Sequence, residues 1–232
     1  MQRPVDVVTL AAGHARPKLV IDFVGGTVGY RLRQGGGLGH ALARAAGFKR
    51  GNIPTVIDAT AGLGRDAFLL ASLGAQVTLF ERSPQVHALL EDALARARAA
   101  RPEVAAIVRR MTLIPGDARA LLPQFQADVV LVDPMHPPRR STALVKQEMR
   151  LLRELAGTDP DADKLMQAAL CHARKRVVLK WPRHAEALPG LLKPSHQILS
   201  NTVRYDVFMA PSSDPQPRGS PPFADALRAA CD

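Results

Sequence analysis

Cysteine is scarce in this sequence and long apolar runs are missing, and each absence excludes a class of protein. The two cysteines among 232 residues, Cys171 and Cys231, have neither disulfide nor metal-ligand spacing. We therefore expect inert thiols in a reducing cytoplasm rather than the bridges of a small secreted protein. No apolar stretch approaches the roughly 20 residues of a transmembrane helix. Residues 1–10 are charged and lack a sustained apolar core, so we expect no secretory signal there.

Acidic residues are also outnumbered, with 21 Asp and Glu against 31 Lys and Arg, which gives a net charge of +10. This balance suits a polyanionic partner such as nucleic acid, but an arginine-rich proteome would produce it too. The excess is concentrated at the start, because residues 1–54 hold eight Lys and Arg against two Asp. We expect a basic face on this part of the chain.

Composition and turn residues divide the chain into three parts. Residues 1–54 form a basic N-terminal extension, and residues 55–210 alternate apolar runs with amphipathic stretches. Residues 211–232 form a tail rich in Pro and Ser, with at most a short helix. No internal repeat is evident.

The extension is predicted to hold a β-hairpin, a glycine-rich loop and a short helix. Residues 19–24 and 27–32 would be the hairpin strands, and residues 40–46 a helix that ends at Gly47. Two basic side chains lie beside the glycine run and are predicted to contact RNA phosphates, Arg31 and Arg33. The alternative is a solvated hairpin followed by a linker.

The segment 55–210 alternates strands with helices, which predicts a doubly wound, mostly parallel sheet of α/β class. The seven predicted strands cover residues 56–59, 76–81, 111–114, 128–133, 176–180, 196–202 and 204–210. The predicted helices cover residues 65–73, 84–100, 143–155 and 162–173. The last two strands are expected to be antiparallel neighbours.

Acidic residues follow four of these strands: Asp58, Glu81, Asp117 and Asp133. Ligands of such sheets bind at the carboxyl ends of the parallel strands, so the four carboxylates should converge on one edge. Gly62 and Gly64 form a turn after Asp58, and glycine lets the backbone approach a ligand closely. Strand, glycine turn, helix, strand and acid together predict a nucleotide-binding βαβ unit.

The ligand of this unit is predicted to be cationic. The loop lacks the Gly-Lys-Ser/Thr of a Walker A motif and fits Gly-x-Gly-x-x-Gly poorly. Asp58 precedes the glycines, where it would repel a pyrophosphate. S-adenosylmethionine (SAM) carries a sulfonium and an ammonium group and no phosphate. Glu81 would then accept hydrogen bonds from its ribose, and Asp117 would lie near its adenine.

These motifs resemble those of a known family. Asp58-Ala-Thr-Ala-Gly-Leu-Gly is similar to motif I of class I SAM-dependent methyltransferases, with Thr60 in place of a usual glycine. Asp133-Pro-Met-His resembles the Asp-Pro-Pro-Tyr type of motif found in enzymes that methylate base amines. Over residues 19–210 the chain resembles RsmJ-type bacterial 16S ribosomal RNA guanine-N2 methyltransferases. This resemblance rests on collinear runs that include Asp22-Phe-Val-Gly-Gly, Ser141-Thr-Ala-Leu-Val-Lys-Gln-Glu-Met-Arg, Asp161-Ala-Asp and Lys175-Arg-Val-Val-Leu-Lys.

The resemblance implies a Rossmann-like methyltransferase fold, SAM as cofactor and 16S rRNA of the small subunit as substrate, in the cytoplasm. The implied cofactor contacts are Arg65, Asp66, Glu81, Arg82, Asp117, Ala118 and Asp133. Asp133 and Pro134 would accept hydrogens from the guanine amine. His136 stands where the family usually has an aromatic residue; we expect it to stack on the base, although an inert loop histidine is the alternative. The other histidines share no metal-ligand spacing, and we expect no metal.

Further basic residues are predicted to bind RNA. Arg139, Arg140 and Lys146 follow the acceptor motif and would contact the phosphate backbone. Lys180 ends a predicted strand and would contact phosphate or guanine O6, with a charged surface terminus as the alternative. Trp181 could pack or stack. Other functions left open are methylation of an amine in DNA or another RNA, and a non-catalytic RNA-binding role in ribosome assembly.

Overall fold

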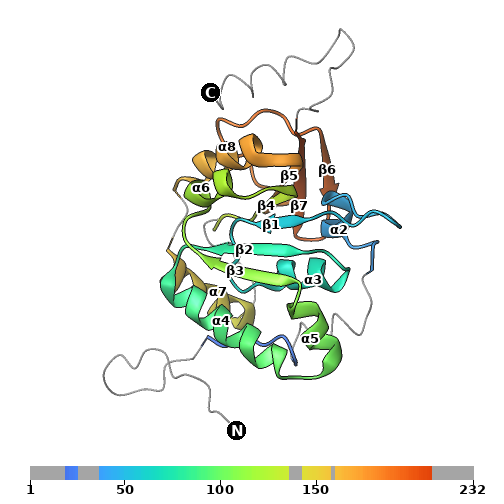
Figure 1. Ribbon diagram of the computed structural model, residues 1–232. Coiled ribbons are helices and arrows are strands. Elements are labelled where there is room, and N and C mark those ends of the chain that lie inside the picture. The colour runs from blue at the N-terminus through green and yellow to red at the C-terminus, as the bar shows by residue number, and fades with distance from the viewer. Residues whose placement is uncertain (1–18, 26–36, 136–142, 158–159, 211–232) are drawn as a thin grey trace.

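The computed structural model describes residues 19–25, 37–135, 143–157 and 160–210. At its centre lies a seven-stranded sheet with the order β3-β2-β1-β4-β5-β7-β6 (Figure 1). Neighbouring strands from β3 to β5 are parallel, and β7 is antiparallel to both β5 and β6. The predicted mostly parallel sheet and its antiparallel final pair are therefore confirmed. The strands are β1 (Val56–Asp58), β2 (Val77–Glu81), β3 (Met111–Pro115), β4 (Ala127–Val132), β5 (Ala173–Pro182), β6 (His196–Leu199) and β7 (Val203–Met209).

Helices cover both faces of the sheet. Side chains of a strand alternate between its two faces, so apolar strands present a surface on each side for helices to pack against. In β4, for example, Val129 and Leu131 join one hydrophobic cluster, and Val130 and Val132 join the other. The first cluster includes residues of α2 (Ala41–Ala45), α3 (Arg65–Ser72), α4 (Pro84–Arg98), α5 (Pro102–Val108) and α7 (Ala143–Ala156). The second includes residues of α6 (Ala118–Leu121), the 3-10 helix η1 (Leu122–Gln124) and α8 (Ala162–His172).

The direction of winding reverses between β1 and β4. From β1 the chain adds β2 and β3 on one side, and it then returns to place β4 and β5 on the other. In open α/β sheets, the loops that leave the carboxyl ends of two such strands diverge, and ligands bind in the crevice between them. Asp58 and Asp133, at the ends of these two strands, lie at that crevice.

The segment before the sheet differs from the prediction. Residues 19–25 contain no strand, so the expected strand over residues 19–24 is wrong, and residues 27–32 lie outside the described ranges. The Asp22 carboxylate accepts hydrogen bonds from Val24 N and Gly25 N at 2.8 and 3.1 Å, and this local turn competes with extended backbone. Ile21 and Phe23 are buried, so the apolar spacing reflects packing on the core rather than pairing in a sheet.

This segment and α2 belong to the same hydrophobic cluster as α3, α4 and α5. The rings of Phe23 and Phe68 stack with centroids 4.9 Å apart. Such pairs stabilise a fold by roughly 0.5–1.5 kcal/mol beyond the burial of their area. The predicted helix over residues 40–46 is confirmed as α2, with His40 as N-cap and Gly47 at φ 80° after it.

The remaining differences are small. The sequence did not suggest α5 and α6, although Pro102 stands at the first turn of α5 and Asp117 caps α6. Cys171, in α8, is disulfide-bonded, so the expectation of a free thiol there is wrong; Cys231 lies outside the described residues. Across the described ranges, every helix is too short or too polar to span a membrane.

Candidate active site

The glycine turn between β1 and α3 has the geometry that its sequence predicts. Gly62 and Gly64 adopt the left-handed φ values 51° and 68°. A Cβ atom on Gly64 would lie 2.8 Å from Leu90 Cδ1 and 3.1 Å from Phe23 Cζ, so no larger residue fits without movement of the core. The turn directs the start of α3, with Arg65 and Asp66 in its first turn, toward the crevice.

Glu81 ends β2 and fixes this turn from the neighbouring strand. Its buried carboxylate accepts hydrogen bonds from Gly62 N at 2.9 Å and from Ser83 N at 2.8 Å. Each carboxylate oxygen thus has one backbone donor, and carboxylate oxygens have lone pairs for more than one. The arrangement fits the predicted role of Glu81 as an acceptor for ribose hydroxyls, with its orientation set in advance.

Three carboxylates and one ammonium group meet at the ends of β1, β4 and β5. Lys180 Nζ donates to Asp66 Oδ2 at 2.6 Å and to Asp133 Oδ2 at 2.7 Å. Burial by itself would lower the pKa of Lys180, but Asp66 and Asp133 raise it well above its usual value, so the side chain is a cation. Lys180 lies inside β5, which continues to Pro182, and the alternative of a charged surface terminus is therefore wrong.

Asp58 is the member of this group that water reaches least. Burial, together with the nearby Asp66 and Asp133 carboxylates, raises the pKa of Asp58 to about 7. Thr60 N, which donates to Asp58 Oδ1 at 3.2 Å, and Lys180 oppose this rise. A cationic group bound beside Asp58 would oppose it further, because it favours the ionised carboxylate.

Thr60 connects the two strand ends of the crevice. Asp133 N donates to Thr60 Oγ1 at 2.7 Å, across 73 positions of the sequence. The residue that departs from the usual glycine of motif I thus holds the backbone of the acceptor motif. The sequence offered the departure itself as a signal, but its partner depends on the adjacency of β1 and β4.

A second polar network lies beyond β2 and β3. Asp117 caps α6 by accepting from Arg119 N, and its carboxylate pairs with the Arg119 guanidinium at 2.5 Å. This hydrogen-bonded pair lowers the pKa of Asp117. The Asp161 carboxylate forms two ion pairs, with the Arg119 guanidinium at 2.7 Å and with the Arg82 guanidinium at 3.3 Å. The sequence pointed to Asp117 and Arg82 as cofactor contacts, but not to Arg119 or Asp161 as the groups that hold them.

For the other predicted site residues, the structure gives the element or the burial but no contact with the groups described above, or it does not describe them. Pro134 is buried directly after Asp133, and Ala118 is buried as the first residue of α6. Lys146 lies on α7. Trp181 is buried and its Nε1 donates to Glu186 O at 2.7 Å, which favours packing. The remaining residues with predicted RNA or base contacts lie outside the described ranges: Arg31, Arg33, His136, Arg139 and Arg140.

The crevice fits a cationic ligand. Among the described residues, the three carboxylates of Asp58, Asp66 and Asp133 surround the ammonium group of Lys180, so acidic groups outnumber the cation there. A phosphate would be repelled there, whereas a sulfonium or an ammonium would be attracted. In the described part of the chain, no three His, Cys, Asp or Glu side chains are arranged to hold a metal ion.

Comparison with known proteins identifies relatives of this chain. A protein of Rhodopseudomonas palustris strain HaA2 named Ribosomal RNA small subunit methyltransferase J is 63% identical over 93% of this chain and 98% of its own length. A protein of the same name from Agrobacterium fabrum is 62% identical over 82% of this chain and 91% of its own. The crystal structure of a SAM-dependent methyltransferase from Neisseria gonorrhoeae matches with a TM-score of 0.62 at 34% identity, covering 84% of this chain and 75% of that one.

The profile of the SAM-dependent methyltransferase family matches residues 5–210, which include the glycine turn, the four strand-end acids and Lys180. The expected class of enzyme, its Rossmann-like fold and its cofactor SAM are therefore confirmed. The chain belongs to the SAM-dependent methyltransferase family.

Proposed function

We propose that this protein transfers the methyl group of SAM to the N2 amine of a guanosine in 16S rRNA of the small ribosomal subunit. The names of relatives more than 60% identical support an rRNA substrate. The net charge of +10 favours a polyanionic partner of this kind. The choice of the guanine amine rests on the resemblance carried by Asp133-Pro134. Such a substrate would be met in the cytoplasm.

The observation that carries the proposal is the position of Asp133. It follows β4 at the switch point, its backbone is held by Thr60, and its carboxylate is bound by Lys180. Its side chain is 40% exposed, so a base amine can approach it from solvent. The oxygens of a carboxylate accept hydrogen bonds, which suits the two N–H hydrogens of an amine.

Contacts from Asp133 and Pro134 would make the guanine amine a better nucleophile. A guanine N2 amine is a poor nucleophile because its lone pair is delocalised into the ring. Hydrogen bonds from the amine to the Asp133 carboxylate and the Pro134 carbonyl favour a localised lone pair and aim it into the crevice. SAM supplies a methyl group on a sulfonium, and the chain contributes orientation and electrostatics for an in-line displacement. The amine proton leaves to Asp133 or to water.

Mapping N2-methylated guanosines in 16S rRNA tests the proposal directly. RNA from cells that lack this protein should be missing one such modification, which the wild-type gene restores and Asp133→Ala does not. An unchanged modification pattern would reject the rRNA substrate. A fully active Asp133→Ala variant that still binds SAM would instead reject the amine contact.

Two other functions remain as outcomes of the same assays. Radiolabel transfer to small subunits, naked 16S rRNA and DNA separates rRNA methylation from methylation of another nucleic acid. A non-catalytic ribosome-assembly role would give no transfer to any of them, with RNA binding intact. The acidic residues of the crevice argue against that role, because RNA binding alone has no use for buried carboxylates.

A further inference from the structure

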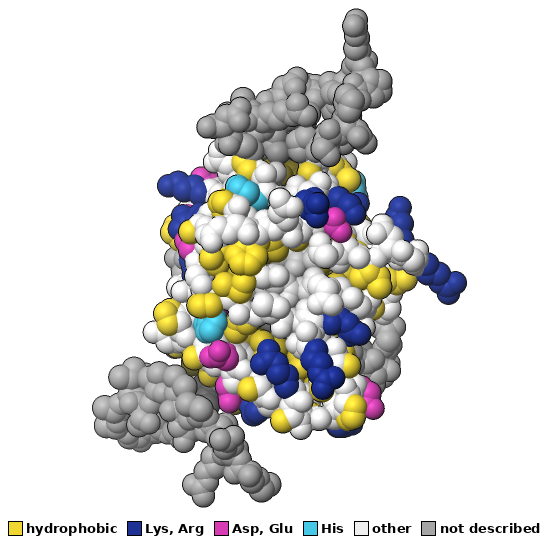
Figure 2. All heavy atoms as spheres, viewed as in Figure 1, with side chains coloured by type: hydrophobic (Ala, Val, Ile, Leu, Met, Phe, Trp, Pro, Cys, Tyr) yellow, Lys and Arg dark blue, Asp and Glu magenta, His cyan; other side chains and the backbone are white. Residues whose placement is uncertain are grey.

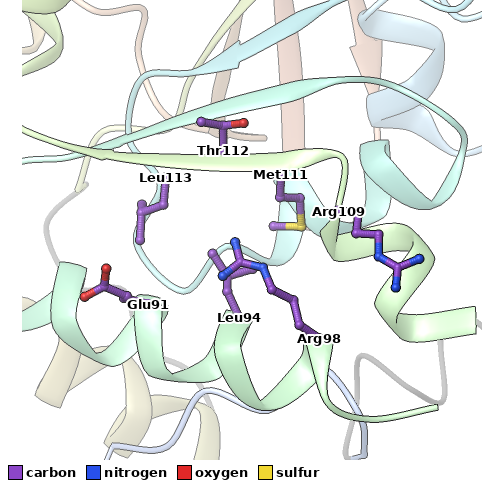
Figure 3. A pocket seen from close by; sticks show the side chains of 7 residues that line it. All are labelled: Glu91, Leu94, Arg98, Arg109, Met111, Thr112 and Leu113. Atoms are coloured by element: carbon purple, nitrogen blue, oxygen red, sulfur yellow. The ribbon is translucent and has the colours of Figure 1, made fainter. Parts of the chain in front are cut away.

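A shallow groove of about 350 Å³ lies between α4 and the outermost strand β3, away from the acidic crevice. It is lined by Glu91, Leu94, Arg98, Arg109, Met111, Thr112 and Leu113. Met111 and Leu113 point from β3 toward α4, while Arg98 reaches along α4 and Arg109 stands before β3 (Figure 3). No function described above uses these residues.

The rim of the groove carries two arginine side chains that a ligand can reach. Arg98 and Arg109 are exposed, and neither forms an ion pair with any residue in the described ranges. They belong to a short stretch, residues 98–110, that holds four arginines and one acid. Figure 2 shows Lys and Arg side chains over this end of α4 and α5. A ligand that satisfies both guanidinium groups would carry negative charge.

The rest of the groove suits a nucleotide. Leu94 and Met111 are buried beneath the groove, and the half-buried Leu113 is the apolar side chain that a base can reach. The Glu91 carboxylate is exposed at one end and would accept hydrogens from a base amino group. Within the described ranges no strand covers the outer edge of β3, so its outward N–H groups can donate to phosphate oxygens.

We infer that this groove is a second binding site for the RNA substrate, which holds a single-stranded segment by its phosphates and one base. The inference rests on the proposed function. The strand residues that line the groove are the first three of β3, whereas the crevice lies at the carboxyl ends of the strands. Five residues of β3 span roughly 13 Å from first to last Cα. The groove therefore anchors the RNA at a point separate from the base that is methylated.

The variant Arg98→Ala/Arg109→Ala tests the site in the full-length protein. Titration with naked 16S rRNA at several salt concentrations should show weaker binding, with the slope of log K against log salt reduced by about 1.4 for two lost phosphate contacts. With small subunits that lack the modification, KM should rise about tenfold, while kcat and the affinity for SAM stay unchanged. The matched control Lys164→Ala/Arg174→Ala removes two exposed charges from α8 and β5 and should leave the slope within error.

Equal slopes and KM values for the two double variants would overturn the inference. A signed pair at Arg98 sharpens the test: Arg98→Glu should raise KM and Arg98→Lys should leave it near the wild-type value. If both have the same effect, the groove is not an RNA site. The titration needs no methylation, so it tests the groove even if wild-type protein fails to methylate rRNA, a failure that would reject the proposed function instead.

Discussion

Two groups of acids lie along the same edge of the sheet and differ in how their charge is balanced. At the ends of β1, β4 and β5, the described carboxylates Asp58, Asp66 and Asp133 surround the cation Lys180. We call this the acceptor cluster. At the ends of β2 and β3, Glu81 is held by two backbone N–H groups and Asp117 by Arg119. We call this the ribose cluster.

The ribose cluster is oriented before its ligand binds, whereas the acceptor cluster is stabilised by the charge of its ligand. Hydrogen bonds from two backbone N–H groups fix the orientation of the Glu81 carboxylate before a neutral ribose binds. The acceptor cluster instead keeps excess negative charge in a partly dry crevice, where it becomes stable when a cation arrives. Changes in charge should therefore matter more in the acceptor cluster than in the ribose cluster.

The largest effect is expected from Lys180→Met. Without the ammonium group, Asp66 and Asp133 repel each other in a half-buried site, and one of them takes up a proton. We expect kcat for methylation to fall about a hundredfold, a loss typical of one catalytic electrostatic group. Steady-state kinetics on small subunits measures it. A rise in KM for RNA with unchanged kcat would contradict this role and favour a contact between Lys180 and RNA.

The matched variant for that comparison is Arg119→Ala in the ribose cluster. It also removes one cation that bridges two acids, Asp117 and Asp161, but at a more exposed position. Ion pairs that solvent reaches contribute little. We expect its activity to stay within about fivefold of wild type. Equal losses in the two variants would remove the distinction between the clusters.

An intermediate effect is expected from Thr60→Val. Valine keeps the shape of the side chain but offers no acceptor for Asp133 N, and an unsatisfied buried N–H costs about 1–3 kcal/mol. We expect kcat to fall about twentyfold with little change in SAM affinity. Thr60→Ser keeps the hydroxyl and should recover most of the rate. If serine and valine perform alike, the hydrogen bond does not position Asp133.

A further test of the acceptor cluster uses pH. Because the folded pKa of Asp58 is about 7 and a cation favours its ionised form, SAM affinity should rise as pH increases through 7. Between pH 6 and 8 the change is about tenfold. Calorimetry in buffers of different ionisation enthalpy should detect a proton released on binding. Asp58→Asn should bind SAM more weakly, with a flat profile over this range; a sloping one would point to another group.

The raised pKa of Asp58 also makes the free energy of unfolding depend on pH. The folded pKa of Asp58, about 7, lies above the ordinary value of 3.8 for an unfolded chain, so the folded protein favours the protonated form. The contribution of Asp58 to the free energy of unfolding is fully present below pH 3.8 and is lost as pH rises through 7. The difference corresponds to about 4 kcal/mol at most. Urea unfolding of wild type against Asp58→Asn should show a gap that widens from pH 4 to 8.

The sequence was sufficient for most of the fold and for the position of the strand-end acids. Apolar runs followed by an acid identify Asp58, Glu81 and Asp133, because parallel strands bring their carboxyl ends to one edge. Gly62 and Gly64 were predictable because a left-handed φ favours glycine. The residues that hold RNA in the proposal remain predictions, since the contacts of Arg31, Arg139 and similar residues lie outside the described ranges.

Partnerships between strands were not predictable in the same way. The pairing of Lys180 with Asp66 and Asp133 depends on β4 lying between β1 and β5, an order that no local pattern encodes. The predicted strand over residues 19–24 failed for a related reason. Alternating apolar residues there satisfy the core, and the turn formed by Asp22 decides the backbone conformation.

The ring of Phe23 stacked on Phe68 bears on how modular this protein is. Phe68 lies two residues after Asp66 on α3, so the N-terminal segment forms one wall beneath the helix that carries a carboxylate of the acceptor cluster. A methyltransferase cut at residue 54 would not simply lose a basic arm; it would expose part of its own interior. Any recombination of this catalytic unit with another RNA-binding module would need to carry residues 19–25 along with it.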